Sequence, residues 1–125
     1  MNFNHYIVFD FETDGVDPYT CQPTQLAAVA INGRTLDIYD NDIFDSLIRP
    51  DDMSKVSDEV LAFTHIDREK LEQAPSKSEV FNNFQVYISR YSRNNTKYGR
   101  PIPAGYNIKG YDMTIIDRLC QEFNK

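Results

Sequence analysis

The sequence predicts an α/β domain in which helices flank a central sheet. Two apolar runs rich in β-branched and aromatic residues, 5–12 and 24–31, predict strands, and the second ends at Asn32-Gly33, a strong hairpin signal. A long amphipathic segment starts at Ser76, and a last helical pattern covers 112–123. With 125 residues, 41% of them hydrophobic, the chain is expected to form one domain, residues 1–125.

The elements between these landmarks are predicted from turn and capping signals. Ser76 and Glu79 form a capping box, and acidic first turns mark two shorter helices before it. In order, we expect a partner strand over 35–49, short helices over 57–63 and 67–72, a helix over 76–91, a loop over 92–100 and a short strand over 101–106. The first three strands would form a meander.

Composition limits the classes of function. No apolar run approaches eighteen residues and the start lacks a signal-peptide pattern, so we expect a cytoplasmic protein without a membrane span. Cys21 and Cys120 lack metal-site spacing and are interpreted as packing residues. No glycine-rich nucleotide cradle is present.

The charge is unevenly distributed. The net charge of −6 argues against broad electrostatic binding of nucleic acid. The window 80–111 nevertheless contains no acidic residue, and it is either a solvated segment or a phosphate-facing patch. Its basic residues include Arg90, Arg93, Lys97, Arg100 and Lys109.

Two acidic residues interrupt the first apolar strand, in the segment YIVFDFETDG (residues 6–15). Side chains alternate along a strand, so Asp10 and Glu12 share one face, with Cα atoms about 6.5 to 7 Å apart. Ionised carboxylates this close in a buried strand repel each other unless a cation lies between them. Magnesium typically takes one or two carboxylates and keeps positions open for phosphate oxygens. The alternative is that the acids stand at a solvent-facing strand end.

A third acid, Asp112, follows a short apolar strand and a glycine-bearing turn and starts the last helix. Carboxylates on strand ends and at a helix start are suited to metal-dependent phosphoryl transfer, because rigid elements fix their distances. The acid pairs Asp40/Asp42 and Asp51/Asp52 lack the pattern of a calcium loop and are expected to be solvated.

The segment VFDFETDG resembles the first motif of the DEDD superfamily of 3′-to-5′ exonucleases, the DnaQ-like group, and AGYNIKGYDMTII resembles its second motif. Between them, QPTQLAAV, SLIRP and LAFTHID are similar to the second strand, the third strand and a helical segment of that family. Bacterial exonuclease I, a member that degrades single-stranded DNA, is similar in the QPTQLAA block and in the spacing from Asn107 to Asp112. The resemblance implies a ribonuclease H-like fold, a central mixed sheet flanked by helices, truncated at its C-terminus.

The resemblance also implies roles for particular residues. Asp10, Glu12 and Asp112 would hold two magnesium or manganese ions and carry catalysis. Thr13 and His65 would contact the 3′-terminal nucleotide, and Asn107 would shape the turn behind Asp112 or contact the substrate. Without the family, Thr13 reads as a strand-end partner, His65 as a helix-end residue and Asn107 as a turn residue. Phe63 and Phe11 are alternative platforms for base stacking.

The third motif of the family, an acid preceded by a histidine or tyrosine, is absent from the chain. Asp117 cannot replace it, because it lies about one and a half turns after Asp112 on the same helix. Residues 1–125 are therefore expected to be the N-terminal portion of the exonuclease domain, with impaired hydrolysis on their own. A partner protein or a second copy is the alternative source of the missing ligand, and a domain that no longer catalyses is a third reading.

The expected function is therefore a metal-dependent 3′-to-5′ exonuclease that removes nucleoside monophosphates from single-stranded ends, with DNA as the preferred polymer. One alternative is an exoribonuclease of the same superfamily. Another is a catalytically incomplete module that binds nucleic acid or a replication protein.

Overall fold

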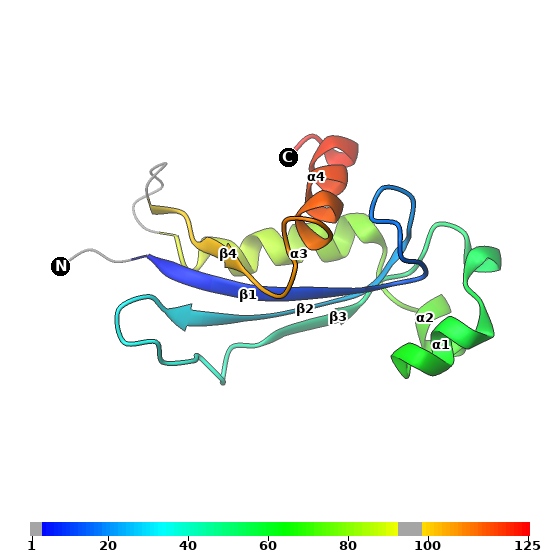
Figure 1. The fold of residues 1–125 in the computed structure, drawn as a ribbon, viewed down its shortest axis with the longest axis horizontal. Helices are drawn as coiled ribbons and strands as arrows, with labels where there is room; N and C mark the ends of the chain where they lie inside the picture. Colours follow the sequence, from blue (N-terminus) through cyan, green and yellow to red (C-terminus); the bar gives the residue numbers. More distant parts are fainter. Residues whose placement is uncertain (1–3, 93–98) are drawn as a thin grey trace.

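The computed structural model describes residues 4–92 and 99–125. Within these residues, four strands form one sheet in the order β3-β2-β1-β4. They are β1 (His5–Thr13), β2 (Pro23–Asn32), β3 (Phe44–Leu47) and β4 (Ile102–Ala104). β1 pairs antiparallel with β2 and parallel with β4, and β2 pairs antiparallel with β3. The expected α/β fold with a mixed sheet and an initial meander is confirmed (Figure 1).

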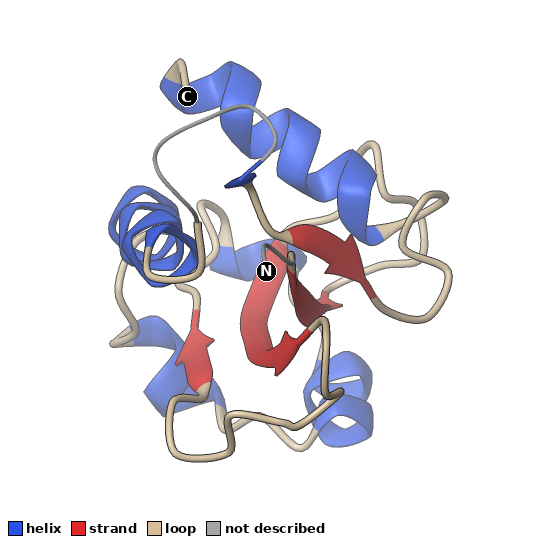
Figure 2. Cartoon of the chain, turned by 90° about the vertical axis from the view of Figure 1, so that its left-hand side faces the viewer, coloured by secondary structure: helices blue, strands red, loops and turns tan. Residues whose placement is uncertain are grey.

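One face of the sheet forms the core. Ile7, Phe9 and Phe11 alternate along β1 and are all buried. They pack against α3 (Lys77–Ser89) and α4 (Asp112–Phe123), which lie on the same side of the sheet (Figure 1). Figure 2 shows α4, the helix that leads to the C-terminus, lying across the top of the strands. The opposite face of β1 carries Asp10 and Glu12, which are exposed and half-buried, respectively.

The predicted helices are confirmed, as is the cap at Ser76, and the two short helices are also capped. Ser57 precedes α1 (Asp58–Thr64), Asp67 precedes α2 (Arg68–Glu72) and Ser76 precedes α3, and each side chain accepts a backbone N–H of the first turn. The short helices and a 3₁₀ turn over Met53–Lys55 lie at one end of the sheet. They enclose a second small core, formed by Val56, Leu61, Ile66 and Leu71.

The expected strand over 35–49 is wrong over most of its length, since β3 covers only Phe44–Leu47. The Asn32 side chain accepts hydrogen bonds from the amides of Arg34 and Thr35, and Leu36 adopts a positive φ of 66°. The chain still reverses here, as the Asn-Gly signal predicts: Asn32 N donates to Asp37 O, and Tyr39 N donates to Ala30 O. The pairing includes a bridge between Ile31 and Ile38, and a second turn over 40–42 then separates it from β3.

Of the acid pairs outside the motifs, Asp40 and Asp51 are exposed, as expected, whereas Asp42 and Asp52 are half-buried. Asp42 accepts a hydrogen bond from the Tyr91 hydroxyl and lies 3.4 Å from the guanidinium of Arg90. Asp51 forms an ion pair of 2.7 Å with Lys77.

Both cysteines are free and contribute to packing, as expected. Over 4–92 and 99–125, no helix combines the length and apolar character that crossing a bilayer requires.

Candidate active site

The structure brings Asp112 to the end of β1. The ladder between β1 and β4 stops at Val8 and Ala104, and the amide of Phe11 lies beyond it. Asp112 is the first residue of α4 and only 2% exposed. Its Oδ1 accepts a hydrogen bond of 3.0 Å from the amide of Phe11. Phe11 is the residue between Asp10 and Glu12, so one hydrogen bond joins the helix start to the paired acids.

The electrostatics of the three acids are mutually unfavourable. Burial, followed by the charges of Asp10 and Asp112, raises the pKa of Glu12. Burial also raises the pKa of Asp112, and the charge of Asp10 adds to this, while the hydrogen bond from Phe11 opposes it. The ion pairs among the described residues involve none of the three acids. A cation would therefore relieve a repulsion that these residues leave uncompensated.

A divalent ion fits this set of donors, although the protein cage is incomplete. Within 4–92 and 99–125, no three His, Cys, Asp or Glu side chains are arranged to hold a metal ion by themselves. Asp10 is more exposed than a buried strand predicts, and it borders a shallow hollow beside Ala27 and Ile43. Magnesium is usually held by one or two carboxylates together with water and phosphate oxygens. The all-oxygen donors and their uncompensated charge match that requirement.

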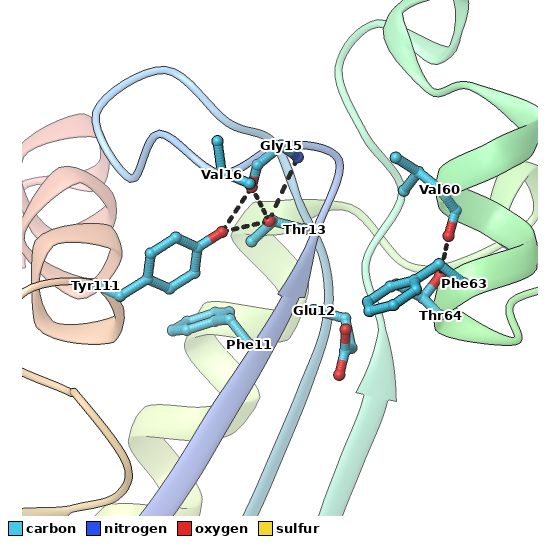
Figure 3. A pocket seen from close by; sticks show the side chains of 9 residues that line it. All are labelled: Phe11, Glu12, Thr13, Gly15, Val16, Val60, Phe63, Thr64 and Tyr111. Carbon is cyan, nitrogen blue, oxygen red and sulfur yellow. Dashed lines mark hydrogen bonds between the residues drawn. The ribbon is translucent and has the colours of Figure 1, made fainter.

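A groove of about 300 Å³ lies beside Glu12 (Figure 3). Its walls come from the end of β1, the following loop, α1 and the residue before α4. Phe63 and Phe11 both line the groove, but Phe63 is 84% exposed, whereas Phe11 is 4% exposed and belongs to the core. Val16, on the loop, is 93% exposed. Phe63 is thus the side chain of the two phenylalanines with a free ring face.

Thr13 lines the same groove and is held by two oxygens. Its Oγ1 lies 2.7 Å from Gly15 O and 2.5 Å from the hydroxyl of Tyr111, which itself lies 2.7 Å from Gly15 O (Figure 3). Burial raises the pKa of Tyr111 to about 12, so its hydroxyl keeps its proton at neutral pH. The motif match singled out Thr13 but not Tyr111, because the contact depends on the packing of α4.

The other two residues expected to touch substrate have clear local roles. His65 is exposed, lies outside the groove lining and ends α1 with a left-handed φ of 58°. Its neighbour Thr64 lines the groove instead. Asn107 is exposed in the turn before α4 with φ of 53°. Shaping this turn accounts for Asn107, and contact of His65 or Asn107 with substrate remains a prediction.

The structure describes three of the five basic residues named in the window 80–111. Arg90 is paired with Asp42, and its guanidinium lies 5.3 Å from the centre of the Tyr87 ring. Arg100 and Lys109 are exposed. Arg93 and Lys97 lie outside the described residues, as does most of the expected loop over 92–100.

Comparison with known proteins identifies the family. The exonuclease family model named for RNase T matches residues 7–101, so the chain belongs to this exonuclease family. The match includes Asp10 and Glu12 and ends before Asp112. The membership predicted from the DEDD motifs is confirmed.

Individual relatives extend well beyond this chain. The PolC-type DNA polymerase III of Staphylococcus haemolyticus is 32% identical over 113 residues, which are 90% of this chain and 7% of that protein. Exonuclease I from Methylocaldum szegediense superposes with a TM-score of 0.75 at 18% identity, over 94% of this chain and 23% of that one.

Two further structures share the fold. Escherichia coli exonuclease I in complex with a dT13 oligonucleotide gives a TM-score of 0.72 at 15% identity, over 95% of this chain and 24% of that one. Cell-death related nuclease 4 gives 0.72 at 18% identity, over 91% of this chain and 40% of that one. At these identities the likeness concerns the fold, and the ribonuclease H-like exonuclease fold is confirmed.

Proposed function

We propose that this domain is a 3′-to-5′ exonuclease that removes nucleoside monophosphates from single-stranded DNA ends. The observation that carries the proposal is the hydrogen bond from Phe11 to Asp112, which joins the helix start to the strand that bears Asp10 and Glu12. Membership of the exonuclease family supports the nuclease class. Residues 1–125 would form the part of the domain that holds the first two motifs.

The three acids would hold divalent cations, magnesium or manganese, as exonucleases of this family generally do. Bound ions, two in the complete site, supply an activated water and neutralise charge on the scissile phosphate and the leaving oxygen. Asp112 is suited to a fixed position because it is buried and hydrogen-bonded. Asp10 is exposed and therefore open to the polymer. The fourth carboxylate and its neighbouring histidine or tyrosine would come from outside these residues.

The groove would hold the terminal nucleotide. Phe63 and Val16 offer apolar surfaces on which a base can stack, and Glu12 is the one of the three acids that lines the groove. Thr13 would contact the sugar end of the nucleotide through a lone pair of its hydroxyl. Exposed aromatic surface favours a single-stranded end, since paired bases are already stacked.

DNA is proposed as the polymer from two relatives. Escherichia coli exonuclease I is described in complex with a dT13 oligonucleotide, and the curated relative is a DNA polymerase. The latter suggests a role in DNA replication, and a further structure of exonuclease I with SSB-Ct suggests a replication protein as partner. RNA is the competing polymer, because these residues contain no feature that distinguishes the 2′-hydroxyl.

A second candidate is a module that binds nucleic acid or a replication partner without catalysis. It is favoured by the finding that, in the described part of the chain, no trio of acidic, histidine or cysteine residues forms a metal site alone. Such a module would gain its missing ligand from a partner or a second copy, or would lack hydrolysis.

Incubation of the natural full-length product with Mn²⁺ and 5′-labelled single-stranded DNA tests the proposal. We expect a ladder of shortened products that disappears in Asp10→Ala. Asp45→Asn is a matched control, since Asp45 is an exposed acid opposite Ala27 on β3, just as Asp10 is opposite Ala27 on β1. This control is expected to retain the ladder.

The result also separates the alternatives. Absence of a ladder, or a ladder unchanged in Asp10→Ala, would contradict the exonuclease proposal. Faster cleavage of RNA than of DNA of the same sequence would assign an exoribonuclease. If no ladder forms, calorimetry with Mn²⁺ and a nucleoside monophosphate distinguishes a binding site, which gives heat that Asp10→Ala removes, from a scaffold, which gives none.

A further inference from the structure

The end of β1 is held by the sheet less firmly than the rest of the strand. The register with β2 shifts between Glu12 and Thr13, and Thr13 lies opposite Pro23, which has no N–H to donate. On the other edge, pairing with β4 has already stopped at Val8. After the shift, Asp14 N donates to Gln22 O at 3.0 Å, and Asp14 Oδ1 accepts the Gln22 amide at 2.6 Å. Thr13 lies between this contact and the regular pairing, so contacts from outside the sheet help to position it.

Consecutive residues at the start of α4 supply such contacts. Asp112 accepts a hydrogen bond from the amide of Phe11, the residue before Glu12. Tyr111 contacts Thr13, the residue after Glu12. The Tyr111 hydroxyl contacts both Thr13 Oγ1 and Gly15 O (Figure 3). The hydrogen bonds from Asp112 and Tyr111 thus lie on either side of Glu12.

The three oxygens of the Tyr111 contact form a closed triangle with sides of 2.5, 2.7 and 2.7 Å. Two hydroxyl protons serve three short contacts. If both hydroxyls donated to Gly15 O, their own oxygens would meet without a proton between them, so one hydroxyl donates to the other and the second donates to Gly15 O. Either arrangement uses both protons within the protein. Gly15 N also lies 3.4 Å from Thr13 Oγ1, so Thr13 keeps a free lone pair only when its hydroxyl donates to Tyr111.

The loop after β1 has a second anchor on the same helix. Arg118 Nη1 donates to the carbonyl oxygens of Pro18 and Cys21, both at 2.8 Å. Neither Arg118 nor these two residues lines the groove. The two anchors can therefore be removed separately, one beside the groove and one away from it.

We propose that Tyr111 is a positioning residue for substrate binding: its hydroxyl fixes the turn from Thr13 to Gly15 and so sets where the groove holds the terminal nucleotide. This inference rests on the proposed exonuclease function. Because Asp112 keeps its own bond to the strand, loss of the Tyr111 hydroxyl displaces the turn and leaves the three carboxylates in place.

Tyr111→Phe tests this, since it removes the hydroxyl and keeps the ring. In the full-length enzyme we expect the KM for single-stranded DNA to rise about five- to tenfold, with less than about a twofold change in kcat. The Mn²⁺ concentration for half-maximal activity should also stay within about twofold, in keeping with the intact Asp112 bond. Thr13→Val should raise the KM similarly, and the double variant should add little, because both variants break one network.

Arg118→Met is the matched control. It frees the same loop at its other anchor, so it should leave the KM near the wild-type value. An equal rise in KM for Arg118→Met and Tyr111→Phe would overturn the proposal, since general loosening of the loop would then explain both. A fall in kcat with unchanged KM in Tyr111→Phe would also overturn it.

Hydrogen exchange separates failure of this inference from failure of the proposed function. The amide of Asp14, which donates to Gln22 O at 3.0 Å within this turn, should exchange at least about tenfold faster in Tyr111→Phe, a local opening that needs no substrate. Equal exchange rates in the variant and the wild type would show that the Tyr111 hydroxyl does not stabilise this turn. A wild-type enzyme with the slow exchange but without nuclease activity would refute the exonuclease function and, with it, the role of Tyr111 in substrate binding.

Discussion

Replacing Asp112 with asparagine separates the charge of this side chain from its hydrogen bond. The new amide oxygen can still accept the N–H of Phe11, whereas the negative charge beside Asp10 and Glu12 is lost. The folded-state pKa of Asp112 is raised above the unfolded value of about 3.9, so the group's stabilising effect is fully present below that value. This contribution is lost as the pH rises through the folded pKa.

Asp112→Asn should therefore be more stable than the wild type at neutral pH in the absence of metal. A stabilisation of about 1 kcal/mol would appear as a rise of roughly 3 to 5 °C in Tm for a domain of this size. The difference should shrink as the pH falls toward about 4, because the wild-type carboxyl group takes up its proton over that range. Asp112→Ala should instead lose about 1 to 3 kcal/mol at every pH, because it leaves the buried amide of Phe11 without its acceptor.

Thermal unfolding followed by circular dichroism from about pH 4 to pH 8 in EDTA measures these differences. Adding Mn²⁺ should stabilise the wild type and not Asp112→Asn, since a ligand stabilises only the form that binds it. Lower stability of Asp112→Asn than of the wild type at neutral pH without metal would refute the reasoning. A stability difference that does not vary with pH would refute it as well.

Three further changes test other parts of the structure. Phe63→Ala should raise the KM for single-stranded DNA about tenfold, since stacking contributes about 1 to 3 kcal/mol per base, while Val86→Ala, an exposed apolar truncation on α3 away from the groove, should leave it unchanged. Gly105→Ala should lower the stability measured by urea unfolding by more than about 1 kcal/mol, because a Cβ there would lie 2.9 Å from Phe9 O and φ is 155°; unchanged stability would contradict this close approach. Ser76→Ala should cost about 1 kcal/mol in the same assay through loss of the α3 cap, with kcat unaffected, and a loss of activity without a loss of stability would contradict the purely structural role.

Elements with local signals were predictable from the sequence. The helix α4 begins and ends at the expected residues, because its apolar spacing and the preceding glycine-bearing turn both lie within the segment. The N-caps of the other helices are likewise encoded within three residues. The hairpin turn after Asn32 was predicted, whereas the second turn over 40–42, which delays β3 until Phe44, was missed.

The candidate site was predictable in its residues more than in its contacts. Asp10 and Glu12 share a strand, so their common face follows from alternation alone. The approach of Asp112 to Phe11 spans 101 positions, and only the family resemblance suggested it. The hydroxyl triangle of Tyr111 depends on where α4 packs, and no spacing rule predicts it. For His65, the sequence match suggested a ligand, whereas the backbone shows a left-handed helix end.

Anomalous diffraction from crystals soaked with Mn²⁺ and a nucleoside monophosphate tests most directly whether the acids act as one cation site. We expect a manganese peak bounded by the carboxylates of Asp10, Glu12 and Asp112, beside the groove that Phe63 lines. Manganese found only elsewhere on the protein, or no peak at all, would contradict the proposed nuclease site.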